Sequence, residues 1–214
     1  RHIAVRDNGA VYVQLAKEKE GSTIAAFKDE DGNGKAETIE YFGKGEGTGV
    51  AVHNNYLYAS SDEAVYRYEL PDEKTIVPSE ESRILIAGWV PKQTSLQSKT
   101  FTLDNEGNLY VNVGAPSNAC MEEARTKGSP GLDPCPQRDR QAGIWKFSAD
   151  KAAQQQESDA SRYAAGIRNA VAIEWNPVTN NLFAMQHGWD HLHQFFPDLY
   201  TLEEGVELPS EEFL

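Results

Sequence analysis

Short apolar runs that alternate with polar residues recur along the chain, and four segments share one pattern. Each has a β-rich run, a turn containing Asn or Gly, and a second run with an aromatic residue at its centre. Asn and Gly tolerate the positive φ angles of tight turns, so the pattern predicts four β-hairpins. They are predicted at residues 3–15, 50–61, 101–114 and 171–188, with Tyr12, Tyr58, Tyr110 and Phe183 as central aromatics.

Two further strand signals follow each of the first three hairpins. They lie at residues 22–29, 36–42, 64–70, 82–89, 143–150 and 161–167. Four strands in a repeat of about 45 residues are typical of a β-propeller blade. We therefore predict an all-β propeller of four-stranded blades, with about three and a half blades in this chain. The alternative is a β-sandwich, but sandwiches rarely repeat so regularly.

Three units and the start of a fourth do not close a propeller ring. We expect residues 1–214 to form a single propeller domain that is a fragment of a larger ring, or one completed by a second copy of the chain. The chain begins directly in a strand pattern, as though an earlier segment preceded it. Helical periodicity is weak and confined to residues 150–160 and 202–214.

The charge balance narrows the range of partners. The chain carries 20 Lys and Arg against 33 Asp and Glu, a formal net charge of −13. Such a surface repels phosphate backbones and anionic lipids, which argues against nucleic-acid binding. No apolar run approaches the roughly 20 residues that a membrane-spanning helix needs, so we expect no membrane span.

The two cysteines lie in one long segment rich in Pro and Gly. This segment, residues 115–142, has neither helical nor strand periodicity and is predicted to be a loop inserted in the third unit. A disulfide between Cys120 and Cys135 would stabilise the loop and would favour a periplasmic or secreted protein. The alternative is a pair of unrelated buried thiols.

Residues 29–40 match a calcium-loop pattern in full. Asp29, Asp31 and Asn33 occupy the first three ligand positions, Gly34 the turn, and Glu40 the last position. Lys35 would offer its carbonyl oxygen and Glu37 a direct or water-mediated contact. The flanking segments are predicted strands, so Glu40 can point away from the loop. A tight Asp/Asn/Gly turn without an ion explains the same residues.

Three of the five histidines lie in residues 186–193. His191 and His193 are two residues apart and would face the same side of a strand, where they could share a metal ion with Asp190. No further ligand stands at a predictable spacing. Histidines packed in a loop explain the pattern better than a transition-metal site.

Several segments together resemble the soluble pyrroloquinoline quinone (PQQ)-dependent sugar dehydrogenases, which include the sorbosone dehydrogenase-like and soluble aldose dehydrogenase-like enzymes. The resemblance is carried by residues 29–42, 47–70, 100–120 and, most specifically, 166–190. It implies a six-bladed propeller that holds PQQ at the mouth of its channel with a calcium ion. It also implies hydride transfer from an aldose or sorbosone-type sugar to the quinone, and an electron acceptor that could be a protein.

The resemblance also assigns roles to individual residues. Arg168 and Asn169 match the family's Arg-Asn pair, which contacts the carboxylate and quinone oxygens of the cofactor; Arg168 is the catalytic candidate. Gln186, His187 and Gly188 match a turn whose backbone oxygens, with that of Trp189, bind the calcium ion bridging to the quinone. A guanidinium suits a carboxylate and backbone oxygens suit calcium.

Two positions depart from the family pattern. Leu96 aligns best with the histidine that removes the sugar hydroxyl proton, and leucine cannot accept a proton. Trp189 precedes Asp190 where the sorbosone-like branch usually has Arg, so it keeps a flat stacking surface but no charge. Lys99 could contribute a positive charge nearby. Leu96 and the incomplete ring favour a second hypothesis, a non-catalytic propeller that binds a sugar, a peptide or another small ligand.

Overall fold

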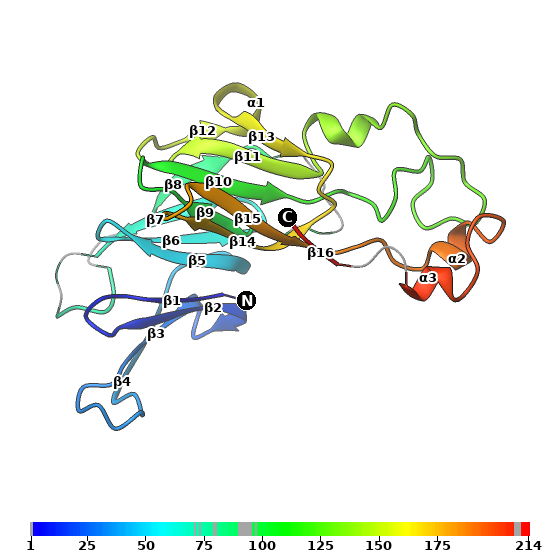
Figure 1. The fold of residues 1–214 in the computed structure, drawn as a ribbon. Helices are drawn as coiled ribbons and strands as arrows, with labels where there is room; N and C mark the ends of the chain where they lie inside the picture. The colour runs from blue at the N-terminus through cyan, green and yellow to red at the C-terminus, as the bar shows by residue number, and fades with distance from the viewer. Residues whose placement is uncertain are drawn as a thin grey trace.

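The four predicted hairpins form the first two strands of four sheets in the computed structural model (Figure 1). The structure describes residues 2–70, 72, 74–78, 81–89, 96, 98–207 and 211–214. The first sheet has the order β1-β2-β3-β4. Its strands are β1 (Ile3–Val5), β2 (Val11–Lys19), β3 (Ser22–Lys28) and β4 (Thr38–Phe42).

The second sheet repeats this meander and gains a fifth strand. Its strands are β5 (Gly47–His53), β6 (Tyr56–Ser61), β7 (Val65–Glu69) and β8 (Arg83–Ala87). The short β12 (Gln154–Gln155) comes from the connection after the third sheet's β11 and pairs in parallel with β8. The order is therefore β12-β8-β7-β6-β5, in which a later segment covers the outer edge of this sheet.

The third and fourth sheets follow the same plan. The third comprises β9 (Phe101–Leu103), β10 (Asn108–Val113), β11 (Gly143–Ser148) and β13 (Ser161–Ala165). The fourth comprises β14 (Ala170–Asn176), β15 (Asn181–Gln186) and the short β16 (Glu212–Phe213). The arrangement is a β-propeller with four blades among the described residues, the last of them partial, which confirms the predicted fold class.

The predicted helical stretches contain only one turn of helix each. α1 (Gln156–Asp159) lies within 150–160, and α3 (Glu204–Glu207) lies within 202–214. The end of the tail is instead strand β16, where Phe213 stacks on the predicted aromatic Phe183. The remaining short helices are α2 (Leu192–Phe195) and the 3-10 turn η1 (Pro136–Asp139). No helix in the described ranges is long and apolar enough to cross a membrane.

Three apolar cores lie between neighbouring sheets, and three of the four repeated aromatics belong to them. Tyr12 packs in the core between the first and second sheets, Tyr58 in the next, and Tyr110 in the core against the fourth sheet. Tyr110 also stacks on Trp175 with ring centroids 5.3 Å apart. The cores give each sheet the apolar burial that a single blade cannot provide alone.

The first strand of each sheet faces a shared central space. Residues of β1, β5, β9 and β14 line one cavity of about 630 Å³. Adjacent sheets contact each other through these strands, as in the packing of β9 against both β5 and β14. This space is the central channel of the propeller, and the ends of the strands define its two mouths.

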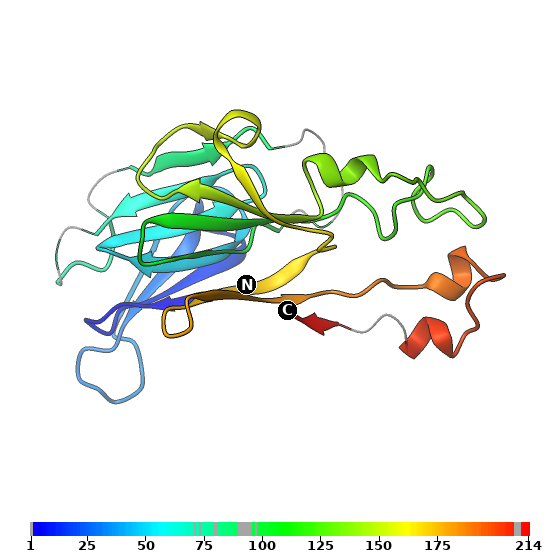
Figure 2. The ribbon, with the colours of Figure 1, turned by 45° about the horizontal axis from the view of Figure 1, so that its top comes forward.

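The predicted cysteine loop connects β10 to β11 and is closed by the disulfide Cys120–Cys135. Two views show this loop and the segment containing α2 and α3 projecting from the same end of the sheets (Figures 1 and 2). The predicted disulfide is confirmed. The loop contains one isolated bridge, Met121 to Gly131, and otherwise little regular structure.

Candidate functional site

The start of β14 and the end of β15 meet at one mouth of the channel because the two strands pair in antiparallel register. The Arg168 backbone N–H donates to Gln186 Oε1 at 3.1 Å, and the His187 N–H donates to the Asn169 carbonyl at 3.0 Å. The Arg-Asn pair and the 186–190 turn, 18 residues apart in sequence, are thus joined directly. Gln186 also bonds Glu212 of β16.

Arg168 is a buried cation whose side chain is only partly paired. The residue is 8% exposed. Its Nη2 donates to Asn118 Oδ1 at 2.9 Å and lies 3.4 Å from Asp190 Oδ2. Its Nε is buried and has no hydrogen-bond partner among the described residues. Burial lowers the pKa of Arg168, and the Asp190 carboxylate opposes that shift. A buried donor left open in this way favours an anionic or carbonyl ligand.

A cavity of about 650 Å³ lies in front of this guanidinium. Its lining includes Leu96, Arg125, Arg168, Gly188, Trp189 and Asp190. Trp189 is 47% exposed, an unusual exposure for a side chain with so large an apolar surface. A flat aromatic face beside a buried cation can receive a planar ligand that carries negative charge.

Leu96 lies at the same cavity, although most of its sequence neighbours, including 90–95 and 97, lie outside the described residues. Its φ angle is 51°, in the left-handed region that leucine rarely adopts. Leu96, the residue predicted to replace the family's base, therefore lines the cavity. At this position the side chain is apolar and provides no proton acceptor.

The backbone of Leu96 approaches Gly114, at the end of the third sheet's second strand. A Cβ atom on Gly114 would lie 2.6 Å from the Leu96 carbonyl oxygen and 2.7 Å from Asn169 Oδ1. We expect Gly114→Ala to destabilise the protein by about 1–3 kcal/mol, because both neighbours must shift. Thermal unfolding measures this. Gly131→Ala is the control, since its added Cβ would meet only ordinary contact at 3.7 Å. Equal melting temperatures for the two variants would contradict this prediction.

Two predicted contact residues are buried away from the cavity lining. Asn169 is 4% exposed, and its Oδ1 accepts a hydrogen bond from Asn112 Nδ2 at 3.0 Å. Lys99 is 1% exposed, with its Nζ 5.8 Å from the centre of the Trp89 ring. Burial lowers the pKa of Lys99 to about 8, and Asp62 partly opposes the shift. Neither side chain is among the residues that line the cavity.

Asp190 is the most highly connected residue of the turn. Arg125 forms an ion pair with its Oδ1 at 3.1 Å, and His191 Nδ1 lies 3.2 Å from the same atom. Burial alone would raise the pKa of Asp190, but hydrogen bonds from Arg125 and His191 and the nearby cations lower it. Asp190 therefore stays ionised and balances the charge of Arg168.

Asn118 and Arg125 were not among the site residues predicted from the sequence. Both lie in the cysteine loop, where nothing in the local pattern distinguishes them from other polar loop residues. Their only signal was proximity to a predicted disulfide in the blade that precedes the Arg-Asn pair.

The histidines do not gather into a metal centre within the described ranges. His187 Nδ1 lies 3.4 Å from Glu211 Oε1, whereas His191 pairs with Asp190. His193 packs against Gly205, where an added Cβ would lie 2.4 Å from its Nδ1.

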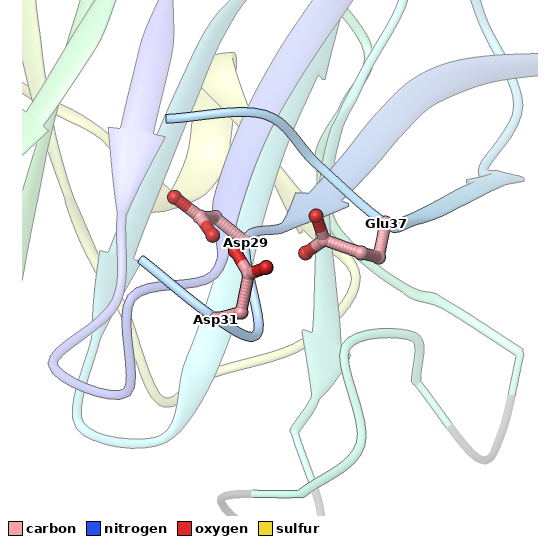
Figure 3. Close-up of side chains that lie close together, drawn as sticks. All are labelled: Asp29, Asp31 and Glu37. Carbon is pink, nitrogen blue, oxygen red and sulfur yellow. The ribbon is translucent and has the colours of Figure 1, made fainter. Parts of the chain in front are cut away.

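The calcium-loop residues form a separate cluster between β3 and β4 (Figure 3). Ligand atoms of Asp29, Asp31 and Glu37 lie within 4.8 Å of one another. Asp29 accepts hydrogen bonds from the backbone N–H groups of Gly34 and Gly32 at 2.8 and 2.7 Å, and the bond from Gly34 contributes most to lowering the pKa of this carboxyl group.

The other predicted calcium ligands are placed differently. Asn33 Oδ1 accepts a bond from the Lys35 N–H at 2.9 Å. Glu40 is paired with Ala26 in the β3–β4 ladder and lies outside the acidic cluster. Glu40 therefore lies in the strand that follows the loop and away from the acidic cluster, as the predicted flanking strands allowed.

The fold and this mouth define a propeller with a cavity at one end of its channel, lined by Arg125, Arg168, Trp189 and Asp190 among others. The sequence matches the model of the TrAA12-like family over residues 1–210, and the chain belongs to that family. The resemblance to PQQ-dependent sugar dehydrogenases is thereby confirmed at the level of family and fold. No curated protein sequence matches the chain.

Solved structures show the same fold at low sequence identity. The holo form of the pyranose dehydrogenase PQQ domain from Coprinopsis cinerea aligns with a TM-score of 0.69 and 18% identity, covering 89% of this chain and 44% of that one. The iodide and calcium structures of Trichoderma reesei Carbohydrate-Active Enzymes Family AA12 align with TM-scores of 0.73 and 0.71 and identities of 17% and 16%. Each covers 100% of this chain and 50% of the other, so this chain spans about half the length of these relatives.

Proposed function

We propose that this chain is part of a propeller that binds PQQ and calcium and oxidises an aldose or sorbosone-type sugar. The observation that carries the proposal is the buried Arg168, which lines the cavity and whose Nε has no hydrogen-bond partner among the described residues. Membership of the TrAA12-like family and the similar fold of the Coprinopsis cinerea PQQ domain support the same assignment.

The residues present fit a planar, polyanionic group such as PQQ. Arg168 lines the cavity and can pair with a carboxylate, and Trp189 can stack on a flat ring system. Backbone oxygens of Gly188 and Trp189 are proposed as calcium ligands, because calcium takes neutral carbonyl oxygens readily. Bound PQQ would supply the quinone that accepts a hydride from the sugar, with calcium polarising its carbonyl oxygens.

The protein's own contribution is binding and orientation. Asp190 and Asn118 hold the Arg168 guanidinium in place, and the Asn169 carbonyl anchors the turn through the His187 N–H. We propose Gln186 and His187 as supports of that turn through Glu212 and Glu211. Removal of the sugar hydroxyl proton needs a base, and Leu96 does not supply one.

A non-catalytic binding propeller is the second candidate, and Leu96 is the observation that favours it. Leu96, the residue that aligns best with the family's base, lines the cavity and cannot accept a proton. A cavity that retains a cation and a stacking face but lacks a proton acceptor can bind a sugar or another small ligand without converting it.

Reconstitution distinguishes these functions. The purified full-length protein is titrated with PQQ in the presence of calcium by calorimetry, and a panel of aldoses is then tested with an electron-accepting dye. Binding with sugar-dependent dye reduction is the expected result for the enzyme. Binding without turnover supports the non-catalytic propeller, whereas no PQQ binding rejects the proposed function.

We further propose that Asp29, Asp31, Asn33, Lys35 and Glu37 hold a structural calcium ion without Glu40, the last residue of the sequence pattern. Asp31→Asn is expected to weaken calcium binding by about tenfold or more, because it removes a charged ligand from an exposed loop. Glu40→Gln is the matched control, since Glu40 lies outside the cluster. Calcium titration by calorimetry measures both; equal loss in the two variants would reject the smaller ligand set.

The remaining proposals concern setting and partners. The disulfide fits an oxidising compartment, so we propose a periplasmic or secreted protein. Continued turnover would require an electron acceptor, which could be a protein. The other blades of the ring would come from a longer chain or a second copy.

A further inference from the structure

We infer that the disulfide-closed loop of the third sheet is a positioning element for the ligand cavity, acting through Asn118 and Arg125 on the turn that contains Asp190. The consequence for PQQ affinity rests on the proposed function, but the positioning itself does not. The loop and the turn belong to different blades, and the contacts between them fix the geometry around Arg168.

Asn118 makes the central contacts. Its Nδ2 donates to the Asp190 carbonyl at 2.6 Å, and its Oδ1 accepts the Asp190 N–H at 3.0 Å. One amide thus pairs with both backbone groups of Asp190, as a neighbouring strand would. The same Oδ1 accepts Nη2 of Arg168 at 2.9 Å. Asn118 is 4% exposed, so an unmade bond would leave a buried polar group without water.

Arg125 contacts the side chain of Asp190, whereas Asn118 contacts its backbone. Its two terminal nitrogens lie 3.1 and 3.2 Å from the two carboxylate oxygens. The contact from Nη2 to Oδ2 is a hydrogen bond and the one from Nη1 to Oδ1 is an ion-pair contact, and together they restrict the position of the carboxylate. The guanidinium carbon lies 6.0 Å from the centre of the Phe195 ring in α2, which limits its freedom further.

A third connection ties the loop to α2. The Gly128 N–H donates to the Phe195 carbonyl at 3.0 Å. Arg125 and Gly128 both lie between Cys120 and Cys135, so the disulfide encloses two of the three connections. The loop has little regular structure of its own, and the covalent closure reduces the number of conformations in which these contacts would be lost.

Asp190 is thus fixed at its backbone by Asn118 and at its carboxylate by Arg125. Because the Arg168 Nη2 donates to Asn118 Oδ1 and lies 3.4 Å from Asp190 Oδ2, the loop also fixes the orientation of that guanidinium. Asn118 and Arg125 are therefore positioning residues. They act on the ligand through Asp190 and Arg168.

Hydrogen exchange tests the positioning without any cofactor. Exchange is followed in peptides covering residues 186–191 in Arg125→Gln, in Asn118→Ala and in the Cys120→Ser/Cys135→Ser double variant. We expect roughly 2- to 5-fold faster exchange in Arg125→Gln, as for the loss of a half-exposed ion pair. Asn118→Ala should exchange about 10-fold faster or more, because several buried bonds are lost. The double variant should resemble Arg125→Gln.

The matched control is Lys127→Gln, which removes an exposed cation from the same loop. Its exchange at 186–191 should equal that of the wild type. Arg125→Lys should be intermediate, since lysine keeps the charge but loses the fork. Wild-type exchange in Arg125→Gln and Asn118→Ala would overturn the inference, and faster exchange confined to residues 115–142 in the double variant would overturn the role of the disulfide.

PQQ affinity provides the second readout. Arg125→Gln is expected to weaken binding 2- to 5-fold, roughly the value of a half-exposed ion pair, and to have no further effect in an Asp190→Asn background. An equal effect in both backgrounds would mean that Arg125 contacts the cofactor directly, and positioning through Asp190 would be rejected. If the wild type binds no PQQ, the proposed function fails while the exchange result still decides this inference.

Discussion

Arg168→Gln is expected to weaken PQQ binding by about 10- to 100-fold, the value of a buried hydrogen bond to a charged group. Arg168 is the cation at the cavity whose Nε is buried without a partner in the described part of the chain. Glutamine keeps much of the length of the side chain but removes its charge and its planar fork of donors. Titration calorimetry with PQQ and calcium measures the change.

The stability of Arg168→Gln should change little, which separates a binding defect from unfolding. Asp190 keeps its ion pair with Arg125, so the substitution leaves no unpaired buried carboxylate. The matched control is Arg162→Gln in β13, an exposed arginine of the neighbouring blade that hydrogen bonds the Arg138 carbonyl. Equal PQQ affinity in the two variants would remove Arg168 from the proposed binding site.

Leu96→His is expected to raise the rate of sugar oxidation by about 10²- to 10⁴-fold, the usual contribution of a general base. The backbone favours the change, because Leu96 has a φ of 51° and histidine is found in that region more often than leucine. The imidazole would be at the wall of the same cavity as Arg168. Dye-linked oxidation at saturating sugar measures the rate.

The dependence on pH identifies the new group. The rate of Leu96→His should rise as pH increases through about 6.5, since only the neutral imidazole accepts a proton. Leu96→Asn is the control, because asparagine also tolerates positive φ but is not a base. If the histidine and asparagine variants turn over at the same rate, Leu96 does not occupy the position of a base.

The strands and their cores were predictable because they depend on local pattern. Tyr12, Tyr58 and Tyr110 recur at the same place in each hairpin, and all three are buried between sheets. The alternation of apolar and polar residues decides which face of a strand packs against the neighbouring sheet. The repeat of this pattern along the chain therefore indicated blades. The short β16 lacked this signal, because two residues are too few to show alternation.

Individual side chains were harder to place than strands. Lys99 was predicted to supply a positive charge near the cofactor, and in the structure it is buried with its Nζ 5.8 Å from the centre of the Trp89 ring, a placement that the sequence did not indicate. Glu40 matched the calcium-loop pattern, but the register of β3 and β4 pairs it with Ala26. The calcium-loop pattern is known from loops flanked by helices. It does not fix the direction of Glu40 here, because the residue lies in a strand, where successive side chains point to opposite faces of the sheet.

The sequence by itself determined the blade repeat, the disulfide loop and the two segments that contain Arg168 and Trp189. Only the tertiary structure decided that Asn118 and Arg125, 72 and 65 residues before Asp190, complete that site. The physical reason is that a hairpin forms from neighbours along the chain, whereas the mouth of a propeller is assembled by blade packing. That packing brings together loop side chains whose separation in the sequence follows no rule. Their contacts therefore cannot be predicted from the sequence.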